Sequence, residues 1–184
     1  MPDSEGLEVV TRAQGGDVDA IGALYDQHHD SIFRYVWSRV GDRHLAEDLT
    51  GDVFAQMLAA LPHYRPSGTP FRGWLYRIAH NRLVDHFRKE NLRAPVPLDA
   101  IEDRRADDGD PTSTVEHRLD VERVQRALSH LDGSHREVVV LRFVCGLSLK
   151  EVALALDKSE AAIKSSQHRG LTALRQALAQ AQVA

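Results

Sequence analysis

Apolar residues recur every three or four positions along most of the chain, and this spacing predicts α-helices. Between residues 21 and 40 it predicts one long helix, which Gly41 closes. Asp17 or Asp19 can cap its start, because a carboxylate accepts hydrogen bonds from the free N–H groups of a first turn. The pair Gly15–Gly16 separates this helix from a short N-terminal segment.

A second helix is predicted to follow Asp42, another capping residue. Apolar residues stand at every fourth position from residue 45 to 61, and Pro62 ends the pattern. Three carboxylates lie on the opposite face: Glu47, Asp48 and Asp52. Such a face either solubilises the helix or docks a basic partner. A paired-carboxylate active site would also require a nucleophile or a base at a meaningful spacing, and none accompanies these residues.

Residues 64–93 form a basic stretch in which seven Lys or Arg residues oppose two acidic ones. Pro70 suits the first turn of a helix, where its missing N–H is not needed. Helical spacing gives the segment one apolar face: Phe71, Leu75, Ile78, Ala79 and Leu83. A second face has a different character: Trp74, Arg77, Asn81, Val84 and Arg88.

This second face suits a nucleic-acid strand. Arginines can meet phosphates, the amide of Asn81 can bond a base edge, and the indole of Trp74 can stack on an unpaired base. The alternative is a solvated amphipathic helix in which Trp74 belongs to the core. The segment alone leaves both interpretations open.

After residue 93 the composition changes. Residues 94–114 are rich in proline and acidic residues and lack any hydrophobic period, so they predict a flexible acidic linker. The chain therefore divides into a first domain, residues 1–93, and a second, residues 115–184. Both halves carry helical patterns, and the predicted fold class is all-α with two small helical domains.

In the second domain the helical period continues even across the β-prone run 138–140. Ser148 and Glu151 have the spacing of a capping box that opens a short helix. A turn at Asp157–Lys158 follows, and Ser159 can cap a longer basic helix. This order is typical of a helix-turn-helix, although packing alone can produce the same outline.

The last helix is predicted to have distinct inner and outer faces. The inner face is apolar or small: Ile163, Gly170, Leu174 and Leu178. The outer face is polar: Ala161, Ser165, His168, Arg169 and Thr172, with Lys164 beside it. Lysine and arginine here can contact phosphate or guanine, while Ser165 and His168 can bond base edges. Gln167 is expected to project inward.

The formal net charge of minus four over 184 residues conceals segments whose net charge alternates in sign. Residues 1–63, 64–93, 94–117 and 118–184 have net charges of −7, +5, −5 and +3. Two basic zones separated by acidic ones predict a protein that touches a polyanion at two places.

Composition also limits the cellular compartment and the catalytic chemistry that we expect for the protein. The single cysteine, Cys145, excludes an internal disulfide and fits a reducing compartment. No apolar window is long enough for membrane insertion, and the N-terminus lacks signal-peptide regions, so we expect a cytoplasmic protein. The histidines form no metal-ligand pattern, and the common nucleotide-binding and nucleophile motifs are missing. We therefore expect neither an enzyme nor a cofactor.

Three ordered segments together resemble bacterial RNA polymerase sigma factors of the extracytoplasmic-function (ECF) type. They are AEDLTGDVF at 46–54, FRGWLYRIAHNRLVDHFRK at 71–89, and the block from 127 to 170. The resemblance covers about residues 20–178 and is closest to the minimal two-domain form. It implies a specificity subunit that binds core RNA polymerase and directs initiation at promoter DNA. Residues 1–93 would form region 2, and residues 115–184 would form the helix-turn-helix of region 4.

The resemblance also implies residue roles. The first segment would dock on the clamp of the polymerase through Glu47, Asp48, Asp52 and Phe54. The second would bind and help melt the minus-ten element through Phe71, Arg72, Trp74, Arg77, Asn81 and Arg88. The last helix would read the minus-thirty-five element as duplex through Lys164, Ser165, His168 and Arg169. An anti-sigma factor is a further implied partner.

The sequence departs from the family pattern at three places. Gly51–Asp52 stands where Gln-Glu is usual, Ser166–Gln167 stands where Arg-Leu is common, and Leu171 stands where Arg is common. The rival interpretation is a free-standing helix-turn-helix transcriptional regulator, which would bind duplex operator without core polymerase. A helical enzyme or interaction module is a third class, and no catalytic constellation supports it.

Overall fold

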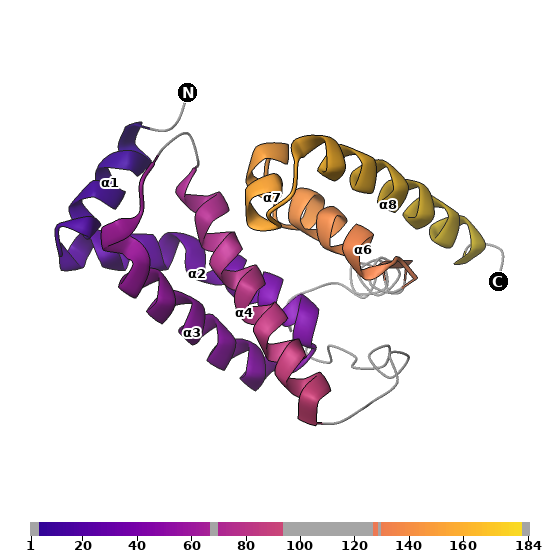
Figure 1. Ribbon diagram of the computed structural model, residues 1–184, viewed down its shortest axis with the longest axis horizontal. Coiled ribbons are helices and arrows are strands. Elements are labelled where there is room, and N and C mark those ends of the chain that lie inside the picture. Colours follow the sequence, from indigo (N-terminus) through magenta and orange to yellow (C-terminus); the bar gives the residue numbers. More distant parts are fainter. Residues whose placement is uncertain (1–3, 67–69, 94–126, 129, 182–184) are drawn as a thin grey trace, which may run out of the picture.

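The computed structural model describes residues 4–66, 70–93, 127–128 and 130–181, and the regular elements in these ranges are all helical (Figure 1). The first half contains α1 (Ser4–Gln14), α2 (Val18–Val40), α3 (Arg43–Ala60), the 3-10 turn η1 (Leu61–His63) and α4 (Phe71–Arg93). The second half contains α6 (Gly133–Val139), the π-helical turn η3 (Val140–Val144), α7 (Leu149–Ala155) and α8 (Glu160–Ala181). The all-α prediction is confirmed, whereas the predicted linker, 94–114, lies outside the described residues.

Local capping fixes the ends of α2 and α3 as the sequence predicts. The carboxylate of Asp17 accepts hydrogen bonds of 3.0 and 3.2 Å from backbone N–H groups of the first turn of α2. Gly41 ends that helix at a φ of 70°, a left-handed conformation that glycine adopts without a Cβ clash. Asp42 then accepts a 2.9 Å bond from the N–H of Leu45 and starts α3.

Helix α1 is a helix that the sequence analysis does not predict. It packs on α2, where Val10 and Ala13 are buried with Leu24. The amide nitrogen of Gln14 donates to the carbonyls of Leu61 and Tyr64, at 2.9 and 2.8 Å. These bonds tie α1 to the turn before α4, so the N-terminal segment supports the start of the basic helix.

Helix α4 packs on α2 and α3 through a face broader than the predicted one. Four of its predicted apolar residues are buried: Leu75, Ile78, Ala79 and Leu83. Tyr76, which the pattern misses, is also fully buried and donates a hydrogen bond of 3.3 Å to the carbonyl of Ser31. A buried tyrosine hydroxyl needs such a partner.

In the second half, capping defines the helix-turn-helix. Ser148 accepts from the N–H of Glu151 at 3.2 Å, and the Glu151 carboxylate accepts from the N–H of Ser148 at 2.7 Å. Both bonds of the predicted capping box are therefore present. Asp157 adopts a φ of 53° in the turn, and Ser159 caps α8 by accepting from the N–H of Ala162 at 3.2 Å.

The two halves share one hydrophobic cluster. Helix α7 packs against α4, and α8 packs on both α6 and α7 (Figure 1). Buried side chains of α2, α3 and α4 join those of the second half, including Leu141, Val152 and Ile163. Among the described helices, none has the length and apolar character that a bilayer span requires.

Candidate nucleic-acid interface

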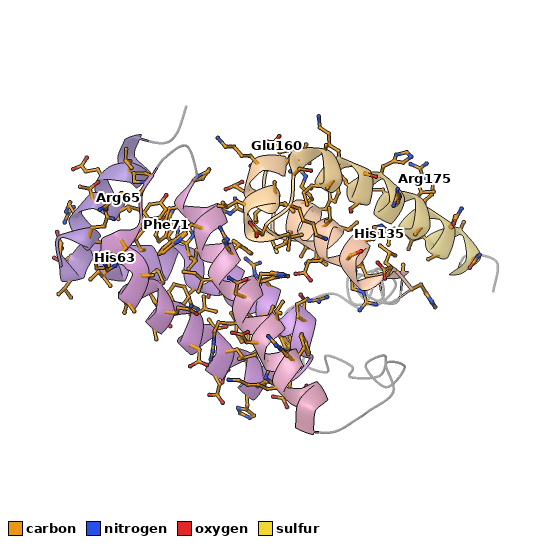
Figure 2. All side chains as sticks on the ribbon, viewed as in Figure 1. His63, Arg65, Phe71, His135, Glu160 and Arg175 are labelled. Atoms are coloured by element: carbon orange, nitrogen blue, oxygen red, sulfur yellow. The ribbon has the colours of Figure 1, made fainter. Side chains whose placement is uncertain are left out.

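Phe71 lies at the start of α4 in the first half of the chain (Figure 2), where it belongs to an aromatic cluster. The ring centroids of Phe71 and Trp74 are 5.4 Å apart. The ring centroid of Tyr64 lies 5.6 Å from that of Phe71 and 4.7 Å from that of Trp74. Phe71 and Trp74 are half-buried. Trp74 thus contributes to packing, as the alternative interpretation held, and retains an exposed part that could meet a base.

His28 lies beneath this cluster, 5.6 Å from the ring of Phe71. Burial, with a smaller contribution from the charge of Arg72, lowers the pKa of His28 from 6.5 to about 4. The imidazole is therefore neutral at pH 7, and it packs as an aromatic ring rather than as a cation.

Two of the cations predicted to meet DNA are engaged within the chain. Arg72 donates a hydrogen bond to the carbonyl of Cys145, just after η3. The guanidinium of Arg77 lies 3.6 Å from the carboxylate of Asp157, in the turn between α7 and α8. Both contacts connect α4 with the second half of the chain.

The other two residues of α4 that are predicted to contact the minus-ten element lie further along the helix. Asn81 lies one turn beyond Arg77, and Arg88 lies three turns beyond it. Both side chains are exposed. The structure therefore divides the predicted minus-ten residues into a half-buried group at the start of α4 and an exposed group further along.

The predicted polymerase-docking residues of α3 also differ in accessibility. Glu47 and Asp48 are exposed, and Glu47 forms an ion pair of 3.1 Å with Arg43. Asp52 is paired with Arg82 of α4. Phe54 is only 4% exposed, so it can support this face from beneath but offers little surface to a partner.

The outer face of α8 is exposed in the part of the chain that the structure describes. The residues predicted to read duplex DNA are all exposed: Lys164, Ser165, His168 and Arg169. The opposite side is close-packed, because a Cβ on Gly170 would lie 2.7 Å from a methyl group of Val139. Gln167 faces inward as expected and accepts a 3.0 Å hydrogen bond from Arg142.

The sequence analysis also missed a buried polar cluster. Glu137 of α6 is 5% exposed and meets Tyr35, Arg39 and His80 of the first half. The available signal was an acidic residue directly before the apolar run 138–141. Across the described residues, no group of three or more potential metal ligands comes together.

Two family models match the chain. The model of Sigma-70 region 2 matches residues 24–93, and that of Sigma-70, region 4 matches residues 127–176. The chain is 37% identical over 172 residues to the ECF RNA polymerase sigma factor BldN of Streptomyces coelicolor, a match that covers 94% of this chain and 65% of that relative. It is 34% identical over 176 residues to the ECF RNA polymerase sigma factor ShbA of Streptomyces griseus, covering 91% and 92%.

A solved structure has a similar fold. The chain matches CnrH, solved in complex with the cytosolic domain of CnrY, with a TM-score of 0.72 and 27% sequence identity. The match covers 95% of this chain and 97% of that one. The likeness extends across both helical halves.

Proposed function

The chain belongs to the ECF RNA polymerase sigma factors, and on this premise we propose that it directs promoter-specific initiation by core RNA polymerase. Region 2, residues 1–93, would bind the polymerase and recognise and melt the minus-ten element. Region 4, residues 115–184, would read the minus-thirty-five element. We place this activity in the cytoplasm.

The observation that carries the proposal is the pair of separate basic helices, each with exposed polar side chains of the kinds that nucleic acid requires. On α4, Asn81 and Arg88 are open to solvent and can meet a base and a phosphate. On α8, Lys164 and Arg169 are exposed on one face of a helix-turn-helix. One chain thus offers both a single-strand surface and a duplex surface.

Exposed carboxylates on α3 support polymerase docking. Glu47 and Asp48 lie in the segment that resembles the family's clamp-binding helix, and neither side chain is buried. Charge complementarity between exposed residues at the rim of an interface mainly accelerates association. We propose these two residues as the main electrostatic contribution to docking.

An anti-sigma factor is a further proposed partner. CnrH, which shares the fold over nearly its whole length, was solved bound to the cytosolic domain of CnrY. A corresponding partner for this chain would hold it away from the polymerase.

Binding to core polymerase tests the proposal. Replacing both Glu47 and Asp48 with lysine should reduce the affinity for core polymerase by about tenfold, because like charges would face each other. The matched control replaces Asp26 and Asp30, two exposed carboxylates of α2, with lysine. Equal losses in the two variants would contradict docking through α3.

The rival regulator makes the opposite prediction. It would bind specific duplex DNA tightly alone and would not bind core polymerase. A binding titration of the wild-type protein against core polymerase and against duplex DNA therefore separates the two functions.

A further inference from the structure

Helix α1 lies outside the segments that the two family models match. It contributes Val10 and Ala13 to a hydrophobic cluster that also contains Leu61 and Tyr64, the residues that begin and follow the turn η1. The half-buried aromatic residues at the start of α4 pack against this cluster. The N-terminal helix therefore borders the aromatic residues that we expect to meet the minus-ten element.

Gln14, the last residue of α1, adds polar contacts to this packing. Its side-chain nitrogen donates to the carbonyl oxygens of Leu61 and Tyr64, at 2.9 and 2.8 Å. A primary amide has two N–H donors on one nitrogen, so this one side chain can hold both carbonyls at once. Since Leu61 begins η1 and Tyr64 is its C-cap, Gln14 fixes both ends of the turn.

The end of α1 is itself held in place. Gly16 has a φ of 86°, which glycine adopts without a Cβ clash, and its N–H donates to the carbonyl of Ala13 at 3.0 Å. Asp17 follows directly and caps α2. The connection between α1 and α2 is thus short and defined by hydrogen bonds. Gln14 reaches η1 from a helix whose direction is set by α2, as precise positioning requires.

Tyr64 passes this support to the start of α4. Its side chain is 6% exposed, and its ring meets the ring of Phe71 edge to face, at an interplanar angle of 88°. The same ring lies 4.7 Å from that of Trp74, centroid to centroid. Because close-packed side chains transmit displacements, a shift of the backbone at Tyr64 would move the surface on which both other rings rest.

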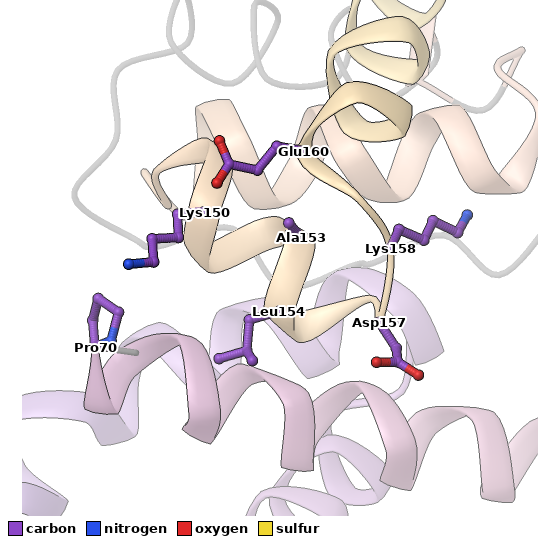
Figure 3. A pocket seen from close by; sticks show the side chains of 7 residues that line it. All are labelled: Pro70, Lys150, Ala153, Leu154, Asp157, Lys158 and Glu160. Atoms are coloured by element: carbon purple, nitrogen blue, oxygen red, sulfur yellow. The ribbon is translucent and has the colours of Figure 1, made fainter. Parts of the chain in front are cut away.

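On the side that faces α7, the segment directly before α4 has less support. Pro70, which precedes the first residue of α4, lines a hollow together with Lys150 and Leu154 of α7 (Figure 3). A hollow supplies few packing contacts. We therefore expect the contacts from α1 to matter more for the position of this part of the chain.

From these contacts we infer that Gln14 is a positioning residue for melting of the minus-ten element. It holds the turn η1 so that the ring of Tyr64 supports Phe71 and Trp74 in the arrangement that an unpaired base requires. Gln14 acts through Tyr64 and does not itself contact DNA. The inference rests on the proposed function, which assigns Phe71 and Trp74 to the minus-ten element.

Two variants separate the hydrogen bonds of Gln14 from the space that its side chain fills. Gln14→Leu keeps a similar volume and removes both N–H donors. Gln14→Glu keeps the shape and places a carboxylate oxygen against two carbonyl oxygens. The matched controls are Gln27→Leu and Gln27→Glu, since Gln27 is an exposed glutamine of α2.

Fluorescence of Trp74 measures the position of the aromatic cluster in the free protein. The chain has two tryptophans, so Trp37→Phe leaves Trp74 as the only one. In this background we expect both Gln14 variants to increase the quenching of Trp74 by acrylamide, with unchanged helical circular dichroism, and both Gln27 variants to leave it unchanged. If Gln14→Glu loses helical signal, Gln14→Leu decides the outcome. Unchanged quenching would overturn the inference.

The kinetics of open-complex formation measure the consequence for melting. The rate at saturating polymerase complex reports opening, whereas its concentration dependence reports initial promoter binding. We expect the Gln14 variants to slow opening by about tenfold, as the loss of one or two ordinary hydrogen bonds would. Initial promoter binding and affinity for core polymerase should match those of the Gln27 controls, whereas a merely less stable protein would lose these two properties first.

An unchanged opening rate, or a loss of polymerase affinity equal to the loss of opening, would overturn the role of Gln14 in melting. A wild-type protein that supports no initiation would overturn the proposed function and, with it, that role. The quenching of Trp74 would still decide whether Gln14 positions the aromatic cluster, because this measurement needs neither DNA nor polymerase.

Discussion

At the residue scale, His28 shows how burial alters an ordinary side chain. The imidazole packs under Phe71, and its pKa falls from 6.5 to about 4 because the charged form loses hydration. In the unfolded chain the same group is hydrated and binds a proton near pH 6.5. Protonation therefore favours the unfolded state between these two pH values.

His28→Gln should flatten this part of the stability profile. Wild-type stability is unaffected by His28 above pH 6.5 and falls as the pH is lowered toward 4, by about 3 kcal/mol in all from this group. Urea unfolding at pH 7, 6 and 5, followed by circular dichroism, measures the difference between the two proteins. Parallel profiles for wild type and variant would contradict a neutral buried His28.

Arg77 and Asn81 are expected to act on melted DNA and not on polymerase binding. Replacing both with alanine should abolish open-complex formation and leave affinity for core polymerase unchanged, because neither lies on α3. Permanganate reactivity of unpaired thymines and a polymerase titration measure the two properties. The control pair is Arg34→Ala with Gln27→Ala on α2, both exposed. Loss of polymerase binding in the α4 variant would refute the assignment.

Lys164 is expected to contact a phosphate, since it is an exposed cation beside the outer face of α8. Lys164→Ala should weaken duplex binding across sequences and reduce the slope of log affinity against log salt by roughly 1. Binding of the polymerase complex to promoter duplex at several salt concentrations measures this slope, with Arg12→Ala on α1 as the control. An unchanged slope would show that Lys164 does not touch DNA.

At the element scale, helix ends were predictable because their causes are local. Asp17, Gly41 and Asp42 act within one turn of their own positions, and so do both partners of the Ser148–Glu151 capping box. Periodicity likewise predicted that the β-prone run 138–140 would be helical. A period read along one helix needs no knowledge of the partner helix.

Features that depend on a partner were not predictable in this way. Helix α1 has only 11 residues, and it is supported by the bonds of Gln14 to residues about fifty positions away. Tyr76 falls outside the predicted apolar face of α4 but belongs to the hydrophobic cluster that both halves share. The need for glycine at position 73 can be recognised only from the close contact with Glu151 and Leu154 of α7.

Two glycines should respond to alanine in opposite directions. A Cβ at Gly51 of α3 would have no neighbour within 4 Å, so Gly51→Ala should stabilise the protein by about 0.5–1 kcal/mol through helix propensity. A Cβ at Gly170 would lie 2.7 Å from Val139, so Gly170→Ala should destabilise it. Urea unfolding of both variants measures the signs. Stabilisation by both would contradict the close packing of α8 on α6.

At the scale of the whole molecule, the charge alternation predicted two surfaces for a polyanion, and the structure carries exposed cations on α4 and α8. The sequence could not predict that the halves pack together, because each half has a complete local pattern and the predicted linker permits compact and extended forms. Glu137 is the clearest case. Its partners come from α2 and α4, and no spacing within α6 reveals them.

Whether the protein confers promoter-specific initiation is the central claim, and run-off transcription by purified bacterial core polymerase tests it most directly. The templates are a library of native upstream regions, with and without the protein. We predict defined transcripts only when the protein is present, starting at sites that share a common upstream sequence. No initiation, together with tight duplex binding by the protein alone, would contradict the account and support the free-standing regulator.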